Sequence, residues 1–166
     1  MFTLLAKLLK ALNSDYSPSQ IAVAICLGMI MGLTPLTALH NVFVLFIVLV
    51  FRVNLGIFLV SLTAFSGVAY LVDPFSELIG YEILTLSLFE PVWVALYSSS
   101  VFRLLEYNNT LVMGSLLLAL VFSPALYWMT KFLVIQYRQQ FMSLVQRSRL
   151  SAWLKGGKLM AAYRQL

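Results

Sequence analysis

The feature that most constrains the fold is the length of the stretches that carry no charge. Residues 18–51 and 55–72 contain no Asp, Glu, Lys or Arg, and residues 110–133 contain one lysine. A helix that crosses the hydrocarbon core of a bilayer needs about 20 predominantly apolar residues. Of the 166 residues, 61% are apolar and 10% are charged, whereas soluble domains have roughly 45–50% and about 25%. We therefore expect an all-α integral membrane protein.

The charged residues predict the orientation. Residues 73–109 carry five acidic side chains and one basic side chain, whereas residues 132–166 carry six basic side chains and no acidic one. Basic residues next to spans mark the cytoplasmic side of a membrane. We expect a multi-pass protein with both termini and Arg52 on the cytoplasmic side, and with the acidic segment on the opposite side.

Pro35 divides the first uncharged stretch into residues 18–34 and 36–51, each marginal in length for crossing a bilayer. Ser17-Pro18 supplies a cap and a first-turn proline for the first piece. Proline lacks an amide hydrogen and disfavours helix in the preceding residue, so Thr34-Pro35 predicts a break. Two geometries remain open for this Pro-broken helical hairpin (18–51). The pieces are either two short full spans, or a re-entrant hairpin whose tip is covered by protein or water.

Further spans are expected at residues 55–72 and 110–133. Asp73-Pro74 is interpreted as the cap and first turn of a new helix, and the 75–107 segment as amphipathic interfacial helices. In the last span Pro124 predicts a kink. An interfacial belt of aromatic and basic residues is expected after it, formed by Tyr127, Trp128, Lys131 and Tyr137.

Both ends of the chain are expected to lie on the membrane surface. Residues 1–14 show a narrow polar stripe on an apolar helix, and no cleaved signal peptide is expected because no basic segment precedes the apolar part. The division is an N-terminal interfacial helix (1–14), a membrane domain (15–135) and a basic cytoplasmic amphipathic tail (136–166). Side chains expected to contact anionic lipid are Lys7, Lys10, Arg138, Arg147, Arg149, Lys155 and Lys158.

Gly28 and Gly32 form a G-x-x-x-G step, which lets two helix backbones approach closely in lipid. The step is expected to pack against the next helix of the same chain, and the alternative is a contact between two copies of the chain.

Thr37, His40 and Asn41 stand at i, i+3 and i+4, which predicts that all three share one helical face. With Thr34 and Pro35 they form the most polar cluster in the uncharged part of the chain. Ionisable residues at membrane depth usually face an interior or a wet cavity. One interpretation is a contact with a ligand, an ion or a lipid headgroup. The other is that these side chains pair with carbonyls that Pro35 frees near residue 31.

Arg52 and Asn54 are further candidates for ligand or lipid contact, because the planar guanidinium suits a lipid phosphate. The alternative is that Arg52 reaches the interface and anchors the turn. No metal site is expected, since the chain has one histidine and its one cysteine, Cys26, lies in an apolar run. Common nucleophile, zinc and phosphate-loop motifs are absent from the sequence.

Several motifs occur in a fixed order, namely a Ser-Pro start, a G-x-x-x-G helix, a proline break, an Arg-x-Asn close and an Asp-Pro. They are Ser17-Pro18, Gly28 and Gly32, Pro35, Arg52 and Asn54, and Asp73-Pro74. This order resembles the bacterial membrane family catalogued as domain of unknown function 2062, over about residues 17–135. The chain departs from the family at Asp73, where relatives usually have asparagine. Some relatives look like appendages of membrane glycosyltransferases, and others look like stand-alone envelope proteins.

The resemblance implies an accessory role in the bacterial inner (plasma) membrane. We expect a non-enzymatic accessory or anchor protein that assembles with a larger envelope partner handling lipid or surface polymer, or with further copies of itself. The alternative is a small oligomeric transporter or lipid-translocating unit with a site at the Pro35 break. A third hypothesis is an enzyme that acts on a lipid headgroup through carboxylates such as Glu77 and Glu82. Membrane lipids, with anionic headgroups at the cytoplasmic face, are the expected partners; neither nucleic acid nor a cofactor is expected.

Overall fold

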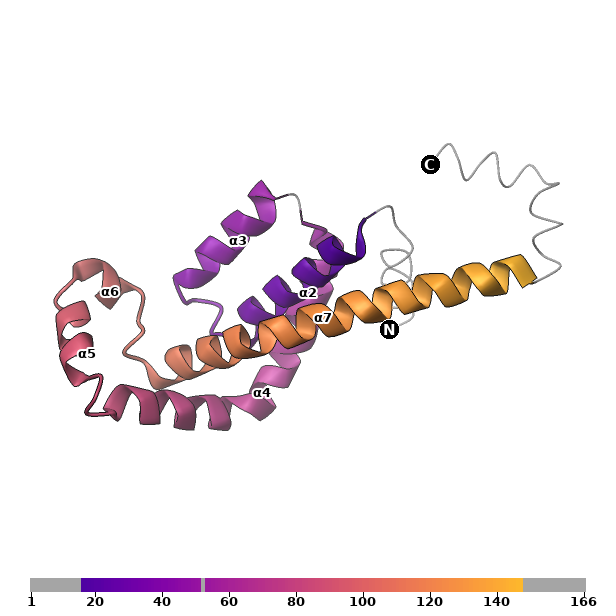
Figure 1. Cartoon of the computed structure of the whole chain (residues 1–166). Helices are drawn as coiled ribbons and strands as arrows, with labels where there is room; N and C mark the ends of the chain where they lie inside the picture. Colours follow the sequence, from indigo (N-terminus) through magenta and orange to yellow (C-terminus); the bar gives the residue numbers. More distant parts are fainter. Residues whose placement is uncertain (1–15, 52, 148–166) are drawn as a thin grey trace. The chain divides into compact units, whose positions relative to one another are not determined.

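The computed structural model describes residues 16–51 and 53–147, and all of its regular elements are helices (Figure 1). This confirms the all-α prediction. The chain divides into two compact units, Met1–Lys131 and Phe132–Leu166. The helices are α2 (Pro18–Leu33), α3 (His40–Val50), α4 (Leu55–Thr85), α5 (Glu90–Tyr97), α6 (Ser100–Leu104) and α7 (Thr110–Arg147), of which α7 continues from the first unit into the second.

Helix α2 begins with the predicted cap. The Ser17 hydroxyl accepts a hydrogen bond from the Gln20 amide at 3.2 Å, and the Gln20 side chain accepts one from the Ser17 amide at 2.8 Å. This reciprocal capping box satisfies two amides that a helix start leaves without partners. Pro18 occupies the first turn, where its missing amide hydrogen costs nothing.

The predicted break at Thr34-Pro35 is also confirmed, because α2 ends at Leu33. The chain then makes turns and re-enters a helix at His40, later than the predicted start of the second piece at residue 36. Helix α3 runs back alongside α2 (Figure 1). Ser19 near the start of α2 and Phe51 after the end of α3 line one cavity, so the two ends of this hairpin lie close together.

The prediction that a span ends at residue 72 and a new helix starts at Asp73-Pro74 is wrong. Helix α4 continues to Thr85 with Pro74 inside it, and Asn54, not Asp73, is an N-cap, accepting from the Ile57 amide at 3.0 Å. An internal proline removes one hydrogen bond and kinks a helix without necessarily ending it. Figure 1 shows α4 changing direction near its middle.

The 75–107 segment therefore contains the end of α4 and two short helices, α5 and α6. Trp93 of α5 donates from Nε1 to the Ile83 carbonyl of α4 at 3.3 Å, which ties α5 to the helix before it. The interfacial location of this segment stays a prediction. Helix α7 is longer than the predicted span 110–133 and passes through Pro124. Of the expected belt, Lys131 Nζ lies 5.1 Å from the Trp128 ring centroid and 5.9 Å from that of Tyr127.

The two glycines of α2 pack against α4. A Cβ atom at Gly28 would lie 2.6 Å from Ser61 Cβ, and one at Gly32 would lie 2.8 Å from the Leu62 carbonyl oxygen. The G-x-x-x-G step therefore serves packing within the chain, as expected, but its partner is α4 rather than the next helix, α3. Small residues at this spacing let the two backbones come together without a side chain between them.

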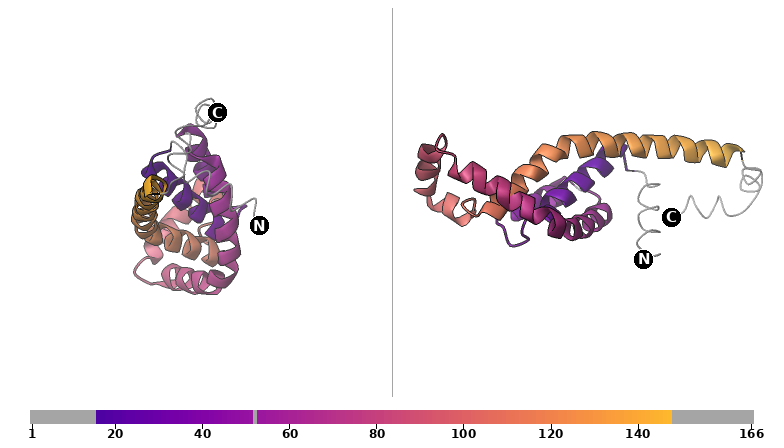
Figure 2. Two further views of the ribbon diagram at one scale, coloured as in Figure 1. Left: turned by 90° about the vertical axis from the view of Figure 1, so that its right-hand side faces the viewer. Right: turned by 90° about the horizontal axis from the view of Figure 1, so that it is seen from below.

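Helix α7 completes the packing of the first unit. Met29 and Leu33 of α2 form a buried cluster with Ala119 of α7, and the Cys26 thiol donates to the Ser123 carbonyl at 3.5 Å. Figures 1 and 2 both show α2 lying beside α4 and α7. The core of this unit is therefore the meeting of these three helices.

Within residues 16–51 and 53–147, two helices are long and apolar enough to cross a membrane, namely α4 and residues Thr110–Gln140 of α7. Only 17% of the most apolar window of α4 and 28% of that of α7 is buried. The core helix of a soluble protein would be mostly buried. The exposure of these apolar side chains therefore agrees with helices that face lipid.

Candidate functional site

The break between α2 and α3 is held by two polar side chains. Thr34 Oγ1 donates to the Ile30 carbonyl at 2.9 Å and lies 3.2 Å from Asn41 Oδ1, and Asn41 Nδ2 donates to the Pro35 carbonyl at 2.9 Å. Both side chains are buried. The predicted pairing of the cluster with backbone carbonyls at the break is therefore found for Thr34 and Asn41.

Thr37 does not take part in this cluster. It lies in the turn before α3 and is exposed, so the prediction that it shares a helical face with His40 and Asn41 is wrong. The error follows from the late start of α3, since helical spacing has no meaning for a residue outside the helix.

His40 is buried, and neither of its ring nitrogens has a hydrogen-bond partner among the described residues. Its ring stacks on Tyr107 with centroids 6.1 Å apart and an interplanar angle of 24°. Tyr107 also meets Phe102 edge-on at 5.5 Å. Burial raises the pKa of the Tyr107 phenol above its ordinary value, so the phenol stays neutral. The start of α3 is thus covered by the loop that precedes α7.

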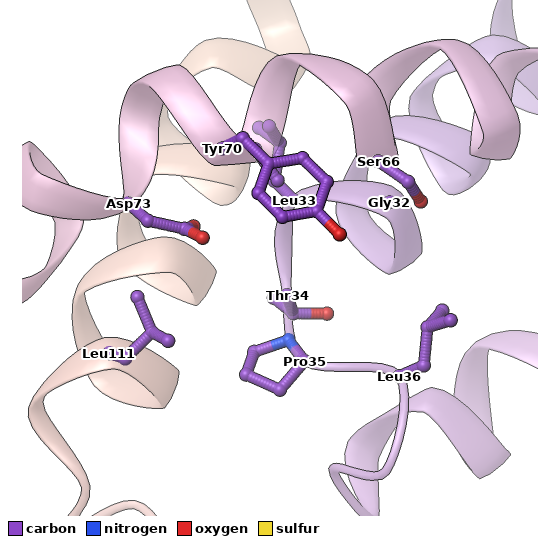
Figure 3. Close-up of a pocket in the computed structure, with 10 residues that line it drawn as sticks. Gly32, Leu33, Thr34, Pro35, Leu36, Ser66, Tyr70, Asp73 and Leu111 are labelled. Atoms are coloured by element: carbon purple, nitrogen blue, oxygen red, sulfur yellow. The ribbon is translucent and has the colours of Figure 1, made fainter.

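A cavity of about 260 Å³ lies beside the proline turn (Figure 3). The end of α2 and the turn form one wall, and the middle of α4 forms another. The residues that line it are Gly32, Leu33, Thr34, Pro35, Leu36, Ser66, Ala69, Tyr70, Asp73 and Leu111. Two of the predicted candidates, Thr34 and Pro35, line this cavity, whereas His40 and Asn41 do not.

Three polar residues of α4 were missed as site residues by the sequence analysis. Ser66, Tyr70 and Asp73 stand at i, i+4 and i+7 and line the cavity from one face of α4. Their spacing is visible in the sequence, but Asp73-Pro74 had been interpreted as the start of another helix. Figure 3 shows Asp73 and Tyr70 on the opposite side of the space from Pro35.

Three features make this cavity favourable for positive charge. The carbonyls of the last turn of a helix have no partners within the helix and carry its negative dipole end, and α2 ends at Leu33 on the cavity wall. Pro74 has no amide hydrogen to donate to the Tyr70 carbonyl. The Asp73 carboxylate, half-buried, adds a negative charge on the same side.

A second close crossing of helices, between α4 and α7, is not among the features predicted from the sequence. A Cβ atom at Gly80 would overlap the Thr110 carbonyl, and one at Gly114 would overlap the Ser76 carbonyl. Ser76-x-x-x-Gly80 and Thr110-x-x-x-Gly114 repeat the small-residue spacing of α2. This crossing fixes the start of α7, including Leu111, beside the cavity.

The remaining predicted residues lie elsewhere. Asn54 caps α4. Arg52, Lys7, Lys10, Arg149, Lys155 and Lys158 lie outside the described residues, as does the predicted helix 1–14. The described part of the tail is the end of α7, which contains Arg138 and Arg147. Within residues 16–51 and 53–147, no group of three or more His, Cys, Asp and Glu side chains is arranged to hold a metal ion.

Comparison with known proteins identifies relatives without assigning an activity. The model of a family described as "Uncharacterized protein conserved in bacteria (DUF2062)" matches residues 3–142, which confirms the resemblance seen in the motifs. A curated relative from Treponema pallidum (strain Nichols), named "Uncharacterized protein", is 29% identical over 139 residues, which are 83% of this chain and 85% of the relative. No solved structure matches the chain.

Proposed function

The chain belongs to the bacterial family DUF2062, and from this premise we propose that it is a multi-pass inner-membrane protein that acts as a non-enzymatic accessory or anchor subunit. Its partner is a larger envelope protein that handles lipid or surface polymer. The two long apolar helices and their exposed faces support the membrane location. The basic tail and the acidic 73–109 segment support cytoplasmic termini.

Helices α2 and α3 form a re-entrant hairpin in this proposal. With a rise of about 1.5 Å per residue, the 16 residues of α2 are about 24 Å long and the 11 residues of α3 about 16 Å. Both are shorter than the hydrocarbon core of about 30 Å. A hairpin that enters and leaves on the cytoplasmic side places the Pro35 turn within the membrane.

The observation that best supports the accessory role is that one side of the Pro35 turn is not covered by the described residues. The Leu36 side chain is 58% exposed, and the amides of Leu36, Thr37 and Leu39 make no hydrogen bond to the described backbone. Each unpaired backbone group in hydrocarbon costs several kcal/mol, so irregular backbone at this depth has to be covered by protein or water. Helix α4 lies on one side of the turn, and a partner subunit covers the other.

Site-specific photo-crosslinking tests this role. A benzophenone amino acid placed at Thr37 in cells is expected to give one discrete adduct with a larger membrane protein. The matched control is the same amino acid at Leu71, which is 75% exposed on α4 outside the turn and is expected to reach lipid. Recovery of the Thr37 derivative without a protein adduct, in repeated preparations, would contradict the accessory role.

The cavity beside Pro35 favours a second function, a small oligomeric unit that moves lipid across the membrane. Binding groups next to interrupted helices are typical of transporters. The test uses liposomes that contain phosphatidylethanolamine labelled with a fluorophore on its acyl chain, with dithionite bleaching as the readout. Faster exchange between leaflets than in empty liposomes, reduced by Asp73→Asn, supports this function. Exchange equal to that of empty liposomes removes it.

A further inference from the structure

The charge of the Asp73 carboxylate is not balanced within the described part of the chain. It has neither a hydrogen-bond donor nor a cation among the described residues. The four glutamates of the structure, Glu77, Glu82, Glu90 and Glu106, are exposed, whereas Asp73 is half-buried on the cavity wall. A carboxylate within an apolar helix is costly unless a cation or donors accompany it.

The residues around Asp73 supply hydrogen-bond acceptors for a cation, and they also form an apolar wall. Helix α2 ends at Leu33 on the cavity wall, so the negative end of its dipole lies there, and Ser66 and Tyr70, which carry hydroxyl groups, also line the cavity. Leu36, Ala69 and Leu111 line the same space. Its volume of about 260 Å³ is several times the roughly 30 Å³ that one water molecule occupies in the liquid. These features fit an organic cation with a short carbon chain better than a bare ion.

We propose that the cavity between the Pro35 turn and α4 binds a primary ammonium group, with Asp73 as its counter-ion. An ammonium group has three donors and no acceptor, and the Asp73 carboxylate offers it an acceptor and a counter-charge on an otherwise mainly apolar wall. The group comes either from the headgroup of an aminophospholipid such as phosphatidylethanolamine or from a free amine. This inference rests on the second candidate function and names the class of ligand that its cavity binds. If the chain binds the amine but does not accelerate lipid exchange, the inference stands and the transport function is removed.

The test measures lipid retention by the full-length purified chain in detergent, using native mass spectrometry with phosphatidylethanolamine and phosphatidylglycerol in competition. The wild type is expected to retain the amine lipid preferentially. Asp73→Asn is expected to weaken that retention about tenfold, because hydrogen bonds to charged groups are the strong ones. The matched control is Glu77→Gln, which removes an exposed carboxylate four residues further along the same helix and is expected to leave retention unchanged.

A second variant keeps the test decisive if Asp73→Asn does not fold. Ala69→Leu fills the cavity and retains the carboxylate, and is expected to lose the preference to the same extent.

A second arm measures thermal stabilisation of the lipid-depleted chain by ethanolamine. Stabilisation of the wild type and Glu77→Gln, but not of Asp73→Asn, identifies a free amine as sufficient. A lipid preference that needs Asp73, without stabilisation by ethanolamine, identifies the lipid as the source. Equal retention of both lipids together with no effect of ethanolamine overturns the proposal, as does unchanged binding in a folded Asp73→Asn or Ala69→Leu variant.

Discussion

Asn41 Nδ2 donates a 2.9 Å hydrogen bond to the Pro35 carbonyl. This bond connects the first turn of α3 to the turn that follows α2. Asn41 is 2% exposed, and its Oδ1 lies 3.2 Å from Thr34 Oγ1. The proline and the asparagine thus act as a pair. Pro35 interrupts the helix, and Asn41 adds a second hydrogen bond to the Pro35 carbonyl, which also accepts from the Ala38 amide at 2.9 Å.

Asn41→Ala is expected to lower the free energy of unfolding by about 0.5–1.5 kcal/mol, because it removes the hydrogen bond from the Asn41 side chain to the Pro35 carbonyl, which keeps its bond from the Ala38 amide. Unfolding of the purified chain by dodecyl sulfate in mixed micelles, followed by circular dichroism, measures the change. Thr37→Ala is the control, since Thr37 is exposed in the same turn. Equal effects of the two substitutions would show that the bond to Pro35 does not stabilise the turn.

Gly28→Ala is expected to destabilise the fold by about 1–3 kcal/mol, because overpacking forces the helices apart. Its Cβ would lie 2.9 Å from the Phe58 carbonyl oxygen, which belongs to backbone and has little freedom to move. Gly67→Ala on α4 is the matched control. A Cβ at Gly67 meets nothing within 4 Å, so this change is expected to stabilise the helix by up to about 1 kcal/mol. The same unfolding measurement on both variants checks the pair, and a loss of similar size in both would contradict the packing described for Gly28.

Gly114→Ala is expected to cost at least about 2 kcal/mol, or to prevent folding, since its Cβ would overlap the Ser76 carbonyl. The yield of monodisperse protein after extraction is the first readout. Limited proteolysis of the 86–109 segment, which connects α4 and α7, is the second. Wild-type yield and an unchanged cleavage pattern would show that the close crossing of α4 and α7 is absent in the membrane.

His40→Phe is expected to leave the free energy of unfolding unchanged or to raise it by up to about 3 kcal/mol. It removes two buried nitrogens that have no partner in the part of the chain that the structure describes, and it keeps the stacking on Tyr107. His40→Ala removes the stacking as well and is expected to destabilise. Unfolding measurements on the two variants separate packing from polarity. A loss of more than about 1 kcal/mol in His40→Phe would indicate that the imidazole has a polar partner beyond the described residues.

The sequence predicted those parts of the fold whose signals are local. Ser17-Pro18 gives a helix start and Thr34-Pro35 gives a break, because both depend on the hydrogen bonds of neighbouring residues. Pro74 was misinterpreted for the opposite reason. Whether a proline ends a helix or is carried inside it depends on packing around it, here the contact of Ser76 and Gly80 with α7, which is not encoded within the segment.

Only part of the candidate site was predicted from the sequence, and the reason is again the difference between local and tertiary signals. Thr34 and Pro35 were found because a proline in an apolar run is conspicuous, and the buried pairing with Asn41 followed from the same logic. Ser66, Tyr70 and Asp73 became a group only once α4 was continuous across residue 73, because their common face depends on unbroken helical spacing. The small-residue steps at Gly80 and Gly114 were present in the sequence, and their partners were fixed by tertiary structure.

The proposed topology places the Pro35 turn within the membrane, and cysteine accessibility tests this position most directly. Thr37→Cys is made in a Cys26→Ser background, since Cys26 is the one native cysteine, and Asn54→Cys and Glu90→Cys serve as references for the two sides. A membrane-impermeant maleimide is expected to label residue 54 from the cytoplasmic side and residue 90 from the opposite side, and to leave residue 37 unlabelled from both. Labelling of residue 37 from the same side as residue 90 would show that α2 and α3 are full spans, and would contradict the re-entrant hairpin.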